Sequence, residues 1–483
     1  MNEVKDKIKL LIGLEIHITL NSKKKIFNWK KTYSGTESPN NEVSPWELGY
    51  PGYLPIINPE TIKAGLSLSA ALKMSTSNYI VFDRKMYNYF DLPKGYQITQ
   101  NKFPFATKGF LPLITEKGTI NVPIRSFHLE EDTAKSIYCS EGIKLDFNRS
   151  GNPLIELVTE PIFQEVNTVI VFIKQLQTLL LVLDISEAKM EKGQLRIDIN
   201  YSLKINPDYC SPRYEIKNLN SLSNIKIALQ KEIEKHLIFF EKKQNPPESS
   251  TLNFDERNKC SKINRKKEEY FFLPEFNIPP IKISEQNKKK AVKNLPYLLP
   301  WKYWKFVKNL ESAKLIEIVQ HPNFFLILKT LNFLIQRKLK IIEEIFVKWA
   351  NFCFNYLQDI LQNDLKKFKK RWKKYLNIFY EWVDKKKDKE TIREEIQNIQ
   401  KKRNLLIPKD TKNEKDNDNL NDSVNNNIKE KLNFLWSDKI KETLNTNFQK
   451  VFNYLLGSLR REYNDINVAK LVKELNNFLD QKK

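Results

Sequence analysis

The chain has 483 residues, which allows about three domains, because a single hydrophobic core stops growing well below that length. Its formal net charge of +23 favours a polyanionic partner such as nucleic acid, although abundant Lys, Asn, Ile and Phe are also what a drift toward AT-rich codons produces. Four cysteines without any CxxC pair argue against a disulfide framework and against a thiolate zinc site.

Neither membrane insertion nor export is expected. The longest apolar run, residues 169–185, falls short of the roughly 20 apolar residues that a transmembrane helix needs, because it is interrupted by Lys174, Gln175, Gln177 and Thr178. We interpret this run as a buried helix. The first residues lead into an alternating pattern with no Arg/Ser-rich presequence, which favours a cytoplasmic protein of bacterial type; the alternative is an organelle matrix after processing.

Short alternating runs characterise the first part of the chain. In GLEIHITL (13–20) and LRIDINYSL (195–203), apolar residues occupy every second position, so that one face packs on a core and the other is polar. Half-buried strands of this kind indicate an antiparallel sheet. Helical periodicity falls at residues 59–74, 166–183 and 221–236, and the predicted fold class is therefore α+β.

From residue 286 the sequence becomes charged, aromatic and helical in period, with apolar runs at 324–335 and 341–357. A later stretch is rich in Asn and Asp and too poor in apolar residues to order itself, and Ser437 is a helix N-cap candidate beyond it. We expect a catalytic domain at residues 1–285, a helical domain at 286–408, a disordered linker at 409–428 and a helical tail domain at 429–483.

The segments FHLEED (127–132) and DFNRSGNPLIELVTEP (146–161) place acidic residues among apolar neighbours, namely Glu130, Glu131, Asp132, Glu156 and Glu160. Carboxylates beside a core carry a desolvation cost that a cation offsets. Oxygen ligands suit Mg²⁺, which usually bridges a few carboxylates to substrate phosphates. The acidic segments therefore predict phosphate chemistry.

The chain has no GxGxxG, Walker-type or nucleophile-elbow motif, so that any nucleotide site must be of another kind. Glu15 and His17 share one strand face, as do Arg196, Asp198 and Asn200, and such faces are what a nucleotide–Mg²⁺ platform requires. A merely solvated face is the alternative for a single antiparallel strand.

Basic residues occur in FDRK (82–85), LPKGYQITQ (92–100) and EIKNLNSL (215–222), where lysines at strand ends are able to bind phosphate or stabilise a carboxyl phosphate. The alternative is structural salt bridges such as Asp83 with Arg84. The basic segment at residues 366–374 carries Phe368 and Trp372 among its lysines; it either contacts phosphates or is a solvated face.

Taken together, several collinear segments resemble the B subunit of the glutamyl/aspartyl-tRNA amidotransferase, the GatB family, over residues 13–283. They are GLEIH, PGYLPIINPE, FDRKMYNYFDLPKGYQITQ, FHLEED, FNRSGNPLIELVTEP, MEKGQLRIDINYS, EIKNLNS and YFFLPEFNIPPI. The resemblance continues weakly through LPYLLP and the tail, from about residue 454 to 479.

This resemblance implies a heterotrimer in which an amidase subunit releases ammonia from glutamine and a small third subunit tethers the two. The B subunit uses ATP and Mg²⁺ to phosphorylate the side-chain carboxylate of Glu or Asp mischarged on tRNA(Gln) or tRNA(Asn), and ammonia attacks the acyl phosphate. The implied fold is an antiparallel cradle similar to the glutamine synthetase and guanidino kinase catalytic domains, followed by an all-helical domain and a small helical tail domain that reach the tRNA.

Site residues are carried over by matching motifs. Glu15, His17, Glu130, Glu131 and Glu156 look like the metal and phosphate shell, with Glu131 catalytic as well. Lys85 and Lys94 look like the residues at which the ammonia tunnel opens onto the activated carboxylate. The nucleotide pocket is represented by Asp198, Lys217 and Asn218.

One departure concerns zinc, which many family members hold with two cysteine pairs in the segments that here read FNWK (27–30) and SPWE (44–47). Those positions carry Asn28, Lys30, Ser44 and Glu47, so that we expect no zinc and local packing through Trp29 and Trp46. Two other classes remain open: a non-catalytic RNA-binding or assembly protein that retains the fold, and a small-molecule carboxylate–amine ligase. The first gives no reason to keep the acidic shell, and the second gives none for a basic, helical C-terminal half.

Overall fold

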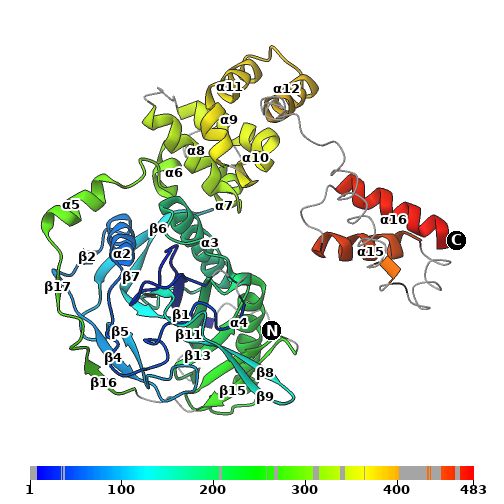
Figure 1. The fold of residues 1–483 in the computed structure, drawn as a ribbon. Coiled ribbons are helices and arrows are strands. Elements are labelled where there is room, and N and C mark those ends of the chain that lie inside the picture. Colours follow the sequence, from blue (N-terminus) through cyan, green and yellow to red (C-terminus); the bar gives the residue numbers. More distant parts are fainter. Residues whose placement is uncertain are drawn as a thin grey trace. The chain divides into compact units, whose positions relative to one another are not determined.

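The computed structural model describes most of the chain (Figure 1). The described residues are 8–33, 35, 38–205, 209–256, 258–265, 270–307, 315–337, 343–363, 365–401, 432–433, 436, 448–462 and 468–482. The chain divides into two compact units, residues 1–396 and 397–483, and each is considered by itself.

The first unit is built on a ten-stranded sheet with the order β15-β14-β13-β11-β1-β10-β7-β6-β2, in which β12 also pairs with β11. The pairs are antiparallel except for β13 with β14. The strands are β1 (Ile8–Thr19), β2 (Ser75–Thr76), β6 (Ala106–Thr115), β7 (Gly118–Glu131), β10 (Pro153–Thr159), β11 (Leu195–Ile205), β12 (Tyr209–Cys210), β13 (Tyr214–Leu219), β14 (Thr251–Asp255) and β15 (Cys260–Arg265). The expected α+β class with a mainly antiparallel sheet is confirmed.

The central strand β1 shows why the sequence alternates. Leu14, Ile16 and Ile18 are buried, whereas the intervening Glu15 and His17 are only half-buried on the other face. β1 pairs with β10 on one side and β11 on the other, which sets His17 opposite both Glu156 and Arg196. The polar residues of three neighbouring strands therefore meet on one face of the sheet.

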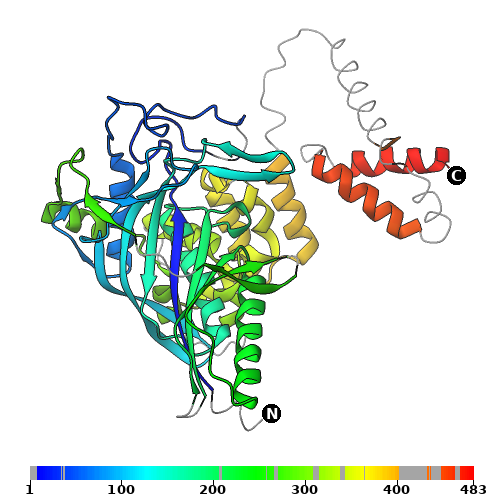
Figure 2. The same cartoon turned by 90° about the horizontal axis from the view of Figure 1, so that it is seen from below.

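Helices cover the apolar side of this sheet (Figures 1 and 2). They are α2 (Pro59–Ala71), which is capped by Asn58, α3 (Val166–Leu183) and α4 (Leu222–Glu241), which is capped by Ser221. By length and composition alone α3 is apolar enough to cross a membrane, and it is the one such helix among the described residues. Half of it is buried, and it packs against β6, α4 and α8 (Phe324–Gln336), which agrees with the prediction of a core helix.

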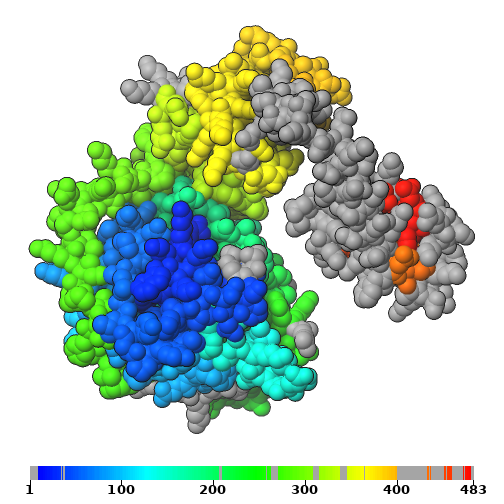
Figure 3. Space-filling model, in the orientation of Figure 1, coloured from blue at the N-terminus to red at the C-terminus, as the bar shows by residue number. Residues whose placement is uncertain are grey.

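Small sheets extend the first unit beside the polar face. β4 (Asp83–Met86) lies between β5 (Tyr96–Thr99) and β16 (Phe272–Pro274), while β17 (Ile281–Lys282) pairs with β3 (Tyr79–Ile80). The strands β8 (Lys135–Cys139) and β9 (Gly142–Asp146) form a hairpin, and η1 (Met190–Lys192) precedes β11. Segments near residues 80 and 275 are thereby joined. Figure 3 shows that the N-terminal segments, drawn in blue, cover much of the visible face of this unit.

From residue 285 to 401 the described elements are all helical, as expected. They are α5 (Glu285–Lys293), α6 (Pro300–Val307), α7 (Leu315–Gln320), α8 (Phe324–Gln336), α9 (Glu343–Phe352), the π-helical turn η2 (Cys353–Leu357), α10 (Gln358–Asn363), α11 (Leu365–Val383) and α12 (Lys389–Lys401). Their core is aromatic: Trp349 packs edge-on against Phe368 and Phe379 at centroid distances of 6.2 and 5.0 Å.

The second unit contains α15 (Phe448–Glu462) and α16 (Val468–Lys482). They bury a leucine-rich contact that includes Leu455, Leu459, Leu471 and Leu475. The linker predicted at residues 409–428 and the N-cap predicted at Ser437 lie outside the described residues.

Candidate active site

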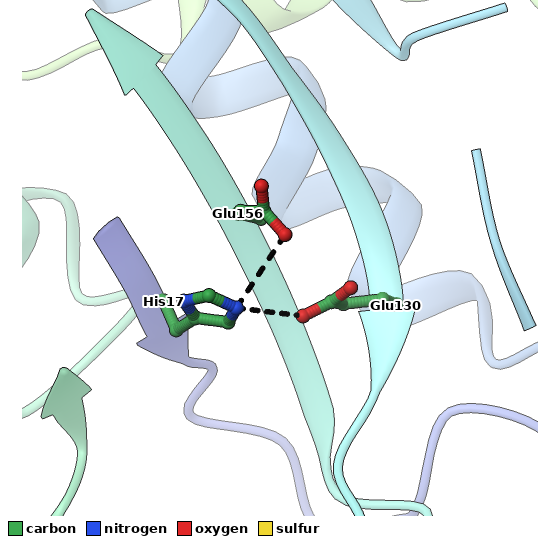
Figure 4. Close-up of side chains that lie close together, drawn as sticks. All are labelled: His17, Glu130 and Glu156. Atoms are coloured by element: carbon green, nitrogen blue, oxygen red, sulfur yellow. Dashed lines mark ion pairs between the residues drawn. The ribbon is translucent and has the colours of Figure 1, made fainter. Parts of the chain in front are cut away.

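The polar face of the sheet brings together one imidazole and two carboxylates (Figure 4). His17 Nε2 on β1 lies 3.4 Å from Glu130 Oε1 on β7 and 3.4 Å from Glu156 Oε2 on β10. One ligand atom from each residue lies within 4.8 Å of the others. We call His17, Glu130 and Glu156 the metal-site cluster, because these donors are spaced closely enough to share one cation.

His128 completes the cluster and was not singled out from the sequence. Its Nε2 lies 3.3 Å from Glu156 Oε2 and 3.6 Å from Glu130 Oε2. Burial alone lowers the pKa of His128, but the charges of Glu156 and Glu130 outweigh burial and raise this pKa to about 10. The alternation of side chains along a strand is the sequence feature that could have revealed this role, since His128 and Glu130 are two residues apart on β7 and share a face.

Glu15 lies beside the cluster rather than among its three donors. Asn200 Nδ2 donates to Glu15 Oε1 at 2.9 Å. Burial raises the pKa of Glu15, and the nearby charges of Glu156, Glu215 and Asp198 raise it further. A cation at this place would relieve the repulsion.

Glu131 points elsewhere. Adjacent residues of a strand face opposite sides, and Glu131, fully buried, accepts from Lys94 Nζ at 2.6 and 2.8 Å and from the backbone N–H of Ile98 at 2.9 Å. Lys94 also lies 4.3 Å from the centre of the Trp46 ring. The structure thus places Glu131 with Lys94, apart from the metal-site cluster to which the sequence had assigned it.

The other acidic residues of the two segments form ion pairs. Asp132 pairs with Arg196 at 3.0 Å, which lowers the pKa of this buried carboxyl despite its burial. Glu160 pairs with Arg125 at 2.9 Å on the exposed surface. The salt bridge of Asp83 with Arg84, given as the alternative to phosphate binding, does not form, because Arg84 pairs instead with Glu275 at 2.7 Å.

Two adjoining cavities open beside the metal-site cluster, and both are lined by His17, Asp198 and Lys217. The first, of about 260 Å³, is lined also by Glu15, Lys85, Glu156, Arg213 and Tyr270. The second, of about 230 Å³, is lined also by Arg196 and Asn218. All three residues predicted for the nucleotide pocket therefore line these cavities, together with Lys85.

Lys217 is the cation at the junction of the two cavities. Its Nζ lies 2.7 Å from Asp198 Oδ2 and 2.9 Å from Glu215 Oε1. These two carboxylates outweigh the effect of burial and raise the pKa of Lys217, so the ammonium group stays charged where the two cavities share a wall.

A second buried polar group occupies the segments discussed for zinc. Glu47 accepts from Asn28 Nδ2, from the backbone N–H of Ser44 at 2.6 Å and from the Ser44 hydroxyl, while Lys25 Nζ lies 3.7 Å from Glu47 Oε1. Lys25 and Glu47 are both fully buried. We call Lys25, Asn28, Ser44 and Glu47 the Lys25–Glu47 network. Trp46 is buried as expected, but the expectation for Trp29 was wrong, since 64% of its surface is exposed.

An antiparallel sheet with acidic, imidazole and ammonium groups converging on its polar face is a platform suited to a metal ion and an anionic ligand. Comparison with known families identifies it further. Residues 10–289 match the GatB/GatE catalytic domain family, and the chain belongs to this family.

The names of curated relatives agree with this family. The chain is 41% identical over 288 residues to a protein of Ureaplasma parvum and 43% identical over 284 residues to one of Coprothermobacter proteolyticus, each named as the B subunit of aspartyl/glutamyl-tRNA(Asn/Gln) amidotransferase. These matches cover 58% and 56% of this chain, and 60% and 59% of the relatives. A protein of the same name from Mycoplasma mycoides is 36% identical over 66% of this chain and 68% of the relative. The matched part thus spans about three fifths of the first relatives' length.

Proposed function

We propose that the chain is the subunit of a glutamine-dependent tRNA amidotransferase that activates the side-chain carboxylate of Glu or Asp mischarged on tRNA. ATP phosphorylates this carboxylate, and ammonia from a partner amidase subunit converts it to the amide of Gln-tRNA(Gln) or Asn-tRNA(Asn). The observation that carries the proposal is the metal-site cluster, which adjoins cavities lined by Asp198 and Lys217. The names of the relatives support it.

The donor set fits a divalent cation. Glu130 and Glu156 supply carboxylate oxygens of the kind that Mg²⁺ prefers, and His17 supplies a nitrogen that Mg²⁺ tolerates less well than Mn²⁺ does. With only three protein donors, a bound ion would keep coordination positions for water and phosphate. Bound there, Mg²⁺ would neutralise charge on the phosphoryl group that is transferred.

The cationic side chains of the cavities are placed to position the two reactants. Lys217, which lines both cavities, offers positive charge to the phosphates, whereas Lys85 lines the first cavity together with Glu156. An ammonium beside the substrate carboxylate would hold it for in-line attack on phosphorus and stabilise the acyl phosphate.

The second step forms the amide. Addition of ammonia to the acyl phosphate forms the C–N bond, expels phosphate and leaves a proton to be removed from nitrogen. The departing phosphate is a base that accepts this proton. Glu131 is fully buried against Lys94 and lines neither cavity, so we assign the Lys94–Glu131 pair to the contact between β5 and β7 beside the site and not to proton transfer.

The remaining partners are an amidase subunit and a small tether subunit in a heterotrimer, and tRNA, with no membrane involved. The helix α11 supports tRNA contact, because Lys369, Lys370 and Lys373 are exposed on it. A non-catalytic RNA-binding protein is disfavoured, since it gives no physical reason for three carboxylates and two imidazoles to meet beside a cavity.

The test is glutamine-dependent conversion of Glu-tRNA by the full chain co-expressed with an amidase and a tether subunit. Glu156→Gln removes one charged donor, and we expect kcat to fall about a hundredfold to a thousandfold, as for loss of a charge-stabilising group. Glu160→Gln is the matched control, because Glu160 is an exposed carboxylate just beyond the same strand. Equal turnover of the two variants would contradict the assignment.

A further inference from the structure

A row of aromatic side chains begins at the first cavity and continues to the surface. Tyr270 lines this cavity together with Lys85, whose Nζ lies 4.2 Å from the centre of the Tyr270 ring. The ring of Tyr87 lies 6.4 Å from that of Tyr270, and Tyr89 stacks on Tyr87 at 4.9 Å with an interplanar angle of 26°. Phe90 follows, 6.3 Å from Tyr89. We call Tyr87, Tyr89, Phe90 and Tyr270 the aromatic shelf.

The fold assembles this shelf from two distant segments. β16 pairs with β4, and the backbone N–H of Met86 donates to the carbonyl of Phe271 at 2.9 Å, which brings Tyr270 beside Tyr87. Tyr89 and Phe90 nevertheless keep 48% of their surface exposed. Large aromatic side chains that remain this exposed next to a cavity are suited to bind a ligand with a flat apolar face.

The two cavities indicate which ligand reaches the shelf. Asn218 lines the second cavity but not the first, whereas Lys85 and Tyr270 line the first but not the second. With the phosphate donor at Lys217 and Asn218, the carboxylate to be activated enters from the side of Lys85. That carboxylate is joined through its amino acid to the terminal ribose of the tRNA, so the unpaired 3′ nucleotides must lie at the mouth of the first cavity.

We propose that the aromatic shelf stacks the unpaired bases at the 3′ end of the aminoacyl-tRNA and so positions the side-chain carboxylate beside the metal-site cluster. This inference rests on the proposed function. Every base has a π face, and stacking on an aromatic side chain tolerates any sequence. The shelf therefore suits an end that is identical in different tRNAs, while Lys85 at its inner end supplies a positive charge to the backbone or the carboxylate.

The first experiment measures amidation by the assembled full-length enzyme with ammonium chloride as nitrogen donor. We expect Tyr89→Ala to raise KM for Glu-tRNA about tenfold and to leave KM for ATP unchanged. Tyr89→Phe should behave like the wild type, because the ring and not the hydroxyl makes the stack. Tyr138→Ala is the matched control, since Tyr138 is a 77% exposed tyrosine on the β8–β9 hairpin outside the shelf.

The second experiment detects stacking without catalysis. A deacylated tRNA carrying 2-aminopurine in place of its terminal adenine should lose fluorescence on binding to the wild type and to Tyr89→Phe, and keep it on binding to Tyr89→Ala. Because both readouts use binding or KM, a variant that merely folds poorly is recognised by a loss of kcat without a change in KM.

The outcomes are separable. If the wild type makes neither Gln-tRNA from Glu-tRNA nor Asn-tRNA from Asp-tRNA, the proposed function fails. If the wild type is active and Tyr89→Ala retains its KM for Glu-tRNA, the inference alone is overturned. A raised KM for ATP with an unchanged KM for Glu-tRNA would also overturn it, because the shelf would then hold the adenine of ATP.

Discussion

Two of the buried polar groups in the first unit, the Lys25–Glu47 network and the metal-site cluster, differ in their surroundings. In the Lys25–Glu47 network, Glu47 accepts hydrogen bonds from Asn28 and Ser44, and the Lys25 ammonium lies 3.7 Å from it as a countercharge. In the metal-site cluster, Glu130 and Glu156 share two imidazoles, and the cluster adjoins a cavity. A group enclosed in the protein stabilises the fold, whereas one whose members line a cavity, as His17 and Glu156 do, is arranged for a ligand.

The network gives the largest expected effect on stability. Glu47→Leu leaves Lys25 fully buried without its countercharge, and breaking a buried pair in this way costs about 3–5 kcal/mol. The double variant Lys25→Met with Glu47→Leu should regain only the part that the unpaired ammonium contributes, because Asn28 and Ser44 still lose their acceptor. Urea unfolding of the three proteins measures it, with amidation per folded molecule expected to stay within about twofold of wild type. If Glu47→Leu is as stable as the wild type, the Lys25–Glu47 network does not stabilise the fold, and the contrast with the metal-site cluster fails.

The contrast between the two groups was only partly visible in the sequence. Alternation in residues 13–20 and 195–203 predicted the strands and their polar faces, because side chains on a pleated strand alternate strictly. It did not reveal which polar faces would be neighbours, since pairing of β1 with β10 and β11 depends on the whole sheet. His128 was missed for that reason.

Glu130 and Glu131 show where prediction from the sequence fails for two adjacent residues. Both were assigned to the metal shell, and the structure separates them onto opposite faces, one to His17 and the other to Lys94. The period of two implies such a separation but does not say which residue faces the cavity. The sequence also did not predict the Lys25–Glu47 network, because this network joins segments whose packing depends on long-range contacts.

The second expected effect concerns α11, whose basic side chains lie at the surface, unlike the charges of the two buried groups. Changing Lys369, Lys370 and Arg371 together to Gln should weaken tRNA binding and reduce the slope of log K against log salt by about 1 to 3, according to how many phosphates they contact. The matched control removes three exposed lysines from α5, namely Lys289, Lys290 and Lys293. Equal slopes in both variants would make α11 a solvated face.

The smallest expected effect concerns a buried histidine outside both groups. Burial lowers the pKa of His236 to about 4, and its Nδ1 lies 2.7 Å from the Tyr209 hydroxyl. Because the folded-state pKa is below the ordinary value, His236 contributes stability above about pH 6.5 that is lost progressively as the pH falls toward 4. His236→Gln should be less stable at neutral pH but lose less stability on acidification. Parallel urea midpoints of the two proteins across this range would refute the assignment.

The most direct test of the central claim follows an oxygen atom. Glu-tRNA labelled with ¹⁸O in its side-chain carboxylate is converted by the assembled enzyme, and the inorganic phosphate released is analysed by mass spectrometry. Activation through an acyl phosphate transfers one carboxylate oxygen to phosphate, so labelled phosphate is expected in proportion to Gln-tRNA, and almost none with Glu156→Gln. Gln-tRNA formed together with unlabelled phosphate would contradict it.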